Sequence, residues 1–141
     1  MLIRILLLGA VCLVLVSGCT SPVPPSVSWG PATIISGDPA VVLAVQAASE
    51  VWGQRSRIEQ SLRDAGVTPA SGSSEAKYAL QVKVGKMAGR GHTSCGRVRN
   101  VAYVLSGDEG RILVIKGRGP TGTCTPNIFD DMSQRLASFF R

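Results

Sequence analysis

The feature that most constrains this chain is an uncharged apolar run close to its first residue. Residues 5–16 contain only Leu, Val, Ile, Ala, Gly and Cys, and Arg4 stands directly before them. A helix that crosses the hydrocarbon core of a membrane needs about 20 apolar residues, so this run is too short to span one. A short apolar run behind a positive charge is typical of a secretory signal. We therefore expect residues 1–18 to be a signal peptide that is absent from the folded body.

The apolar run ends in the four residues Val16-Ser17-Gly18-Cys19. This aliphatic-small-small-Cys pattern resembles the lipobox of bacterial lipoprotein precursors. The resemblance implies cleavage before Cys19, a diacylglycerol on its sulfur and an acyl chain such as palmitate on its new amino group. Two or three acyl chains attach a protein almost permanently, because a single myristoyl chain is already marginally sufficient. The alternatives are an ordinary signal peptide with an incidental cysteine, or a buried N-terminal helix.

The residues after Cys19 predict which membrane holds the anchored protein and how far the folded domain lies from it. In enteric lipoproteins an Asp at the next position retains the protein in the inner membrane, whereas this chain has Thr20. By that resemblance we expect the periplasmic side of the bacterial outer membrane, with the inner membrane as the alternative because the sorting rule varies. Residues 19–28 are rich in proline and predict an extended tether of about 25 Å. Residues 29–141 then form a single domain.

The first half of this domain contains one weak strand pattern followed by a helical pattern. Residues 27–35 are a weak strand candidate because Gly30-Pro31 interrupts them. Asp38-Pro39 is typical of a helix entry, and the apolar spacing behind it predicts a helix over 39–65 that breaks near Gly53.

The second half predicts a strand, a hairpin and a last helix. Apolar and polar residues alternate over 78–84, and two β-rich runs, 97–105 and 111–118, flank the turn-like segment SGDEG. A helix that enters at Thr125-Pro126 carries the apolar stripe Ile128, Met132, Leu136 and Phe139. We therefore predict an α+β fold, a mixed or antiparallel sheet of about four strands with two helices packed on one face.

The hairpin also makes a prediction about the cysteines. If Glu109 and Gly110 are the two central turn residues, Cys95 lies opposite Cys124. Cys12 leaves with the signal peptide and Cys19 carries lipid, so an even pair remains, and an oxidising periplasm favours a disulfide between them. The alternative is a metal site made of His92, Cys95 and Cys124, which lacks the fourth ligand of a structural zinc site.

Motifs for catalysis or cofactor binding are weak in this sequence. GRGPTG, residues 117–122, matches the dinucleotide-binding pattern, but it holds a proline and no second strand with an acidic residue follows it. The only histidine, His92, is the single candidate for a Ser-His-Asp arrangement. We therefore expect no enzymatic activity, no cofactor and no metal, with an enzyme that depends on His92 as the remaining alternative.

Positive charge is concentrated in residues 77–118, which hold nine Lys and Arg against two acids. Such a surface suits anionic lipids, wall polymers or an acidic protein patch, although an ordinary solvated sheet face would look the same. The predicted hairpin register turns toward the helices the side chains of Val98, Ala102, Val104, Leu113 and Ile115. The residues predicted to contact a partner are Lys86, Arg90, Arg97, Arg99, Tyr103, Lys116 and Arg118. Nucleic acid is disfavoured because few aromatic side chains are available for stacking.

The body contains LRDAGV, then AKYALQVKV, a predicted hairpin and the last helix NIFDDMSQRLASFF. In this pattern it resembles the small α/β lipoproteins of Gram-negative envelope assembly, among them the lipopolysaccharide-assembly lipoprotein and some secretion pilotins. The resemblance implies a non-enzymatic accessory protein that binds a component of the assembly or secretion machinery. The alternative is direct binding of an anionic glycolipid or cell-wall polymer through the basic sheet face.

Overall fold

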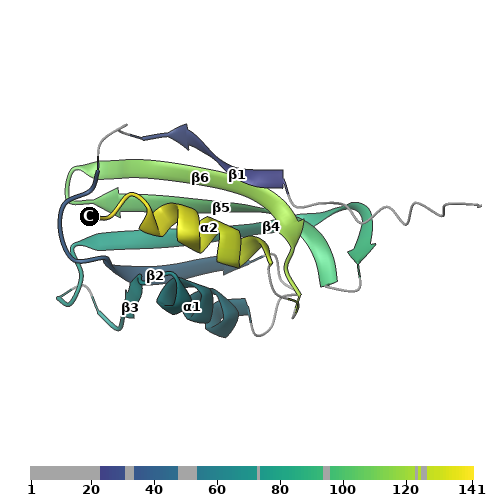
Figure 1. Cartoon of the computed structure of the whole chain (residues 1–141), viewed down its shortest axis with the longest axis horizontal. Helices are drawn as coiled ribbons and strands as arrows, with labels where there is room; N and C mark the ends of the chain where they lie inside the picture. The colour runs from purple at the N-terminus through teal and green to yellow at the C-terminus, as the bar shows by residue number, and fades with distance from the viewer. Residues whose placement is uncertain are drawn as a thin grey trace, which may run out of the picture.

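A computed structural model of the chain describes residues 23–30, 34–47, 54–72, 74–93, 96–122, 124 and 127–141. They form an α+β fold in which two helices cover one face of a six-stranded mixed sheet, in the strand order β1-β6-β5-β4-β2-β3 (Figure 1). This confirms the predicted fold class, with a larger sheet than expected. The elements are β1 (Val23–Trp29), β2 (Ala40–Ala47), α1 (Gln54–Asp64), β3 (Thr68–Ala70), β4 (Tyr78–Thr93), β5 (Gly96–Gly107), β6 (Gly110–Pro120) and α2 (Ile128–Ala137). In these ranges no helix is both long and apolar enough to cross a membrane.

The β5–β6 hairpin has a different register from the one that the sequence predicted. Gly107 pairs with Gly110, so Asp108 and Glu109 form the turn, and an irregularity follows between Leu105 and Ser106. Gly110 has a φ of 108°, a conformation that glycine adopts without strain. Because side chains alternate along a strand, an error of one residue in register exchanges the two faces of β5 relative to β6.

The predicted faces of β5 were therefore wrong. Val101, Tyr103 and Leu105 belong to the core beneath the helices, whereas Ala102 takes the opposite face. On β6, Leu113 and Ile115 face the core as expected.

Residues 40–47 form a strand, and the helix predicted over 39–65 is wrong in its first half. β2 lies between β3 and β4 and runs parallel to both. Val41 and Leu43 are buried at alternate positions, which is the period of a strand, and the β-branched side chains suit a sheet. The helical spacing of Val41 and Val45 fits a strand equally well, so pairing with β3 and β4 decides between the two.

The two helices close the core over the sheet. In α1, Ile58 and Leu62 are buried, as predicted for the second half of the long helix. The N-cap of α2 is Asn127 rather than Thr125, and its side chain accepts backbone N–H groups while Asp130 bonds back to the cap. This capping box satisfies N–H groups that a helix start leaves free. The core residues of α2 are Ile128, Phe129, Met132 and Leu136.

β1 is an edge strand, which corrects the predicted tether over 19–28. Val23–Trp29 pairs antiparallel with β6. Proline has no N–H to donate, and a sheet edge is where a strand can hold Pro24 and Pro25. Residues 23–28 are thus part of the sheet, and only residues 20–22 lie between Cys19 and the start of β1 in the sequence.

Candidate functional site

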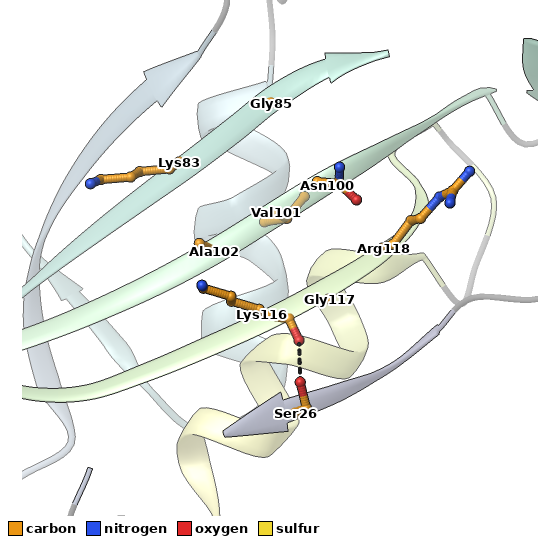
Figure 2. Close-up of a pocket in the computed structure, with 9 residues that line it drawn as sticks. All are labelled: Ser26, Lys83, Gly85, Asn100, Val101, Ala102, Lys116, Gly117 and Arg118. Atoms are coloured by element: carbon orange, nitrogen blue, oxygen red, sulfur yellow. Dashed lines mark hydrogen bonds between the residues drawn. The ribbon is translucent and has the colours of Figure 1, made fainter. Parts of the chain in front are cut away.

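An open groove of about 590 Å³ lies across four strands of the sheet. Figure 2 shows it on the side of the sheet opposite the helices. The groove spans β1, β6, β5 and β4, which are neighbours in the sheet. Its lining residues are Ser26, Lys83, Gly85, Asn100, Val101, Ala102, Lys116, Gly117 and Arg118.

Strand register explains why these residues meet. Lys83 pairs with Ala102, Ala102 with Lys116, and Lys116 with Ser26, so one row of paired positions crosses all four strands. The next row on the same face pairs Asn100 with Arg118, and Arg118 with Val23. The groove is therefore a product of the fold, since its residues come from strands far apart in the sequence.

The shape of the groove follows from side-chain size. Gly85 and Ala102 are small and leave a low floor between the longer side chains of the two rows. A Cβ atom placed on Gly85 would lie 3.2 Å from the Asn100 carbonyl oxygen, so a larger residue fits poorly there. The Ser26 hydroxyl donates to the Lys116 carbonyl oxygen at 3.5 Å and joins the edge strand to the rim.

The charged side chains that line the groove are all positive. Lys83, Lys116 and Arg118 are exposed, and no acidic residue lines the groove with them. Within the described ranges none of these three side chains forms an ion pair, since the two pairs found there join Glu59 to arginines of α1. Two ammonium groups, a guanidinium and the Asn100 amide can all donate hydrogen bonds, and so can bind carboxylate, phosphate or sulfate groups.

Two of the predicted contact residues are buried, and the structure corrects both. Tyr103 is fully buried beneath α2, and its hydroxyl lies 3.1 Å from the Ser133 hydroxyl and 3.5 Å from the Phe129 carbonyl oxygen. Burial raises the pKa of the Tyr103 phenol well above its usual range, more than the bond to Ser133 lowers it. Arg99 is 6% exposed and donates to the Gly85 carbonyl oxygen at 3.1 Å. Both side chains are therefore held inside the fold rather than on the exposed surface that the sequence predicted.

The other predicted contact residues divide into three groups. Lys116 and Arg118 are exposed and line the groove, so they stay predicted contact residues. Lys86 and Arg97 are exposed but lie outside the lining, and the Arg90 side chain lies outside the described part of the chain. The sequence-based prediction did not choose Lys83, Asn100 and Ser26, which also line the groove. The alternation that places Lys83 opposite the core positions of β4 was the available signal.

The remaining motifs of the sequence either take part in packing or disulfide bonding, or lie outside the described residues. Gly117, in GRGPTG, passes close to α2, because a Cβ atom there would lie 2.8 Å from the Ile128 Cδ1 atom. Cys124 is disulfide-bonded, whereas Cys95 lies outside the described ranges, so its pairing with Cys124 remains a prediction. Cys19 and the His92 side chain also lie outside them. Within the described ranges no group of His, Cys, Asp and Glu could hold a metal ion.

Comparison with known proteins gives a likeness in fold. No protein-family model and no curated sequence matches the chain. Among solved structures, a substituted PelC dodecamer from Paraburkholderia phytofirmans matches with a TM-score of 0.55 and 18% identity, over 83% of this chain and 98% of that one. A second crystal form of the PelC dodecamer matches with a TM-score of 0.50 and 18% identity, over 82% and 93%. At this identity the likeness shows the fold alone.

Proposed function

We propose that this chain is a non-enzymatic accessory protein of the bacterial cell envelope, anchored by lipid on Cys19 at the periplasmic side of the outer membrane. It binds an anionic envelope component through the groove. The observation that carries this proposal is a groove with three exposed cations and no acidic residue, built across four strands on the face that the helices leave uncovered.

The form of the groove supports recognition rather than catalysis. Its cations lie on separate strands around a floor of small residues, an arrangement that can contact several negative groups of one ligand. Electrostatic contacts of exposed groups weaken at high salt, so binding should be strongly salt-dependent. The lipid anchor supplies a high local concentration at the membrane, which compensates for a modest affinity of the groove.

The anchor is tested first, by the mass of the mature N-terminal peptide and by cell fractionation. We expect the protein to begin at an acylated Cys19 and to fractionate with membranes, and a Cys19→Ala variant to lose the lipid. A protein that keeps residues 1–18 and carries a free thiol at Cys19 would overturn the proposal.

The groove is tested by a triple variant, Lys83→Ala/Lys116→Ala/Arg118→Ala. Its matched control removes three exposed cations outside the groove, Lys77→Ala/Arg111→Ala/Arg141→Ala, and so changes the net charge equally. Crosslinking in intact cells should capture an envelope component with the wild type and the control but not with the groove variant. Equal capture by all three would reject the groove as the binding surface.

The likeness to PelC dodecamers favours a second candidate property, assembly of several copies of this chain. The two matching structures share the fold over most of both chains. An assembly of such subunits would present many copies of the groove and increase avidity for a repetitive ligand. Native mass spectrometry of the detergent-solubilised protein tests this, because a monomer at all concentrations would contradict assembly.

A further inference from the structure

The distance between the lipid anchor and the groove is limited by covalent geometry. β1 begins at Val23, four residues after Cys19. Extended chain spans at most about 3.6 Å per residue, so the Cα atoms of Cys19 and Val23 are at most about 14 Å apart. Val23 pairs with Arg118, which lines the groove.

The dimensions of a bilayer show that this distance is short enough for the groove to reach the membrane surface. The headgroup layer on each side is about 5–8 Å thick, the difference between a hydrocarbon core of about 30 Å and a full width of about 40–45 Å. The Debye length at physiological ionic strength is about 8 Å. A tether of about 25 Å would place the groove roughly three Debye lengths away, whereas the short connection keeps the Arg118 end within reach of the surface potential.

The groove and such a surface are complementary in charge and in form. Arg118 lies at the end of the groove that the anchored strand enters, and Lys116 and Lys83 lie in the adjacent row, on β6 and β4 (Figure 2). The face is open rather than enclosed, and it is free of helices. Several headgroups in a plane can therefore contact the three cations together.

We propose that the groove docks on the anionic headgroups of the membrane that holds the lipid anchor. This inference rests on the proposed attachment at Cys19 and deepens it by naming the ligand as phosphate-bearing lipid headgroups. In the docked state the uncovered face of the sheet lies against the membrane, and the layer of α1 and α2 points away from it. The helix layer is then the side presented to proteins of the periplasm.

Trace modification of lysines in the lipidated protein tests the docking. The protein is reconstituted into vesicles of phosphatidylcholine alone and into vesicles that also contain phosphatidylglycerol, and the reaction rate of each lysine is read by mass spectrometry. We expect the rates of Lys83 and Lys116 to fall about fivefold in the anionic vesicles, since about 1 kcal/mol for each basic side chain near such a surface corresponds to that factor. Lys77, which is exposed outside the groove, should keep its rate and serves as the internal control.

Two charge-reversal variants and a measurement at high salt test whether the protection is electrostatic. Arg118→Glu should abolish the protection of Lys83 and Lys116, while Arg111→Glu, with the same charge change at the hairpin turn, should preserve it. At about 1 M salt, where the Debye length is about 3 Å, the protection should disappear.

The outcomes separate the inference from the function on which it rests. Equal rates in both vesicles, with the protein still anchored through an acylated Cys19, would overturn docking and leave the proposed function standing. Protection by a purified anionic polymer on neutral vesicles, without protection by phosphatidylglycerol, would also overturn it and name the polymer as the ligand. Failure to find lipid on Cys19 would instead overturn the proposed function.

Discussion

The two faces of the sheet are made by the same strands and have opposite properties. On the helix side, Val82, Tyr103 and Ile115 are fully buried in one apolar core. On the other side, Lys83, Ala102 and Lys116 stand one residue away from them along β4, β5 and β6, and they line an open cationic groove. The comparison teaches that strand alternation gives one face to the core and leaves the other open for the proposed recognition, so each face should respond to substitution in its own way.

The largest expected loss of stability is for a substitution on the helix side of the sheet. Phe129 of α2 is fully buried, and Phe129→Ala should lower the free energy of unfolding by about 3–5 kcal/mol, through lost burial and the cavity that it leaves. Chemical denaturation measures this. A loss below about 1 kcal/mol would mean that α2 does not pack on the sheet as described.

A smaller loss of stability is expected on the same side when the buried hydroxyl of Tyr103 is removed. Tyr103→Phe removes the contacts with Ser133 and with the Phe129 carbonyl oxygen, and should cost about 1–2 kcal/mol. Tyr78→Phe is the matched control, because the Tyr78 hydroxyl donates to the Ser36 carbonyl oxygen at an exposed site. Equal losses for the two variants would contradict the burial of Tyr103.

Tyr103 also predicts a dependence on pH. Its pKa is raised in the folded protein, so the unfolded chain loses this proton first, near the ordinary value of about 10. The contribution to stability is therefore complete below about pH 10 and is lost as the pH rises further. Unfolding measured across this range should show that Tyr103→Phe removes this part of the decline, and an unchanged pH profile would contradict it.

The smallest effect on stability is expected in the groove. Ala102→Leu fills the floor between Lys83 and Lys116 without touching the core, and should change the free energy of unfolding by no more than about 0.5 kcal/mol. The same substitution should abolish ligand binding by removing the space. A strongly destabilised Ala102→Leu protein would show that this face is packed in the native state, and the comparison of the two faces would fail.

Sequence patterns predicted the parts of the fold that depend on local spacing. Leu80, Val82 and Val84 alternate as a strand, and Ile128, Met132 and Leu136 recur as a helix, because burial of one side sets each period. These local patterns were sufficient to predict an α+β fold with two helices on one face.

The errors arose where distant pairing decides the structure. Residues 40–47 are a strand because β3 and β4 flank them, and neither neighbour is visible in the local pattern. The faces of β5 depend on one irregularity between Leu105 and Ser106, and without it Tyr103 and Arg99 were assigned to the exposed side. Alternation along β4 puts Lys83 opposite the core positions, but only the register across three strands places it beside Lys116.

The most direct test of the account compares the depth of the two faces at a membrane. Nitroxide labels are attached at Gln81→Cys, on the uncovered face two residues from Lys83 and outside the groove lining, and at Gln134→Cys, on the exposed side of α2, in lipidated protein on anionic vesicles. Relaxation by a paramagnetic metal held on lipid headgroups reports which label lies nearer the membrane. We predict strong relaxation at position 81 and weak relaxation at position 134. Stronger relaxation at position 134 would contradict the claim that the uncovered cationic face meets the membrane.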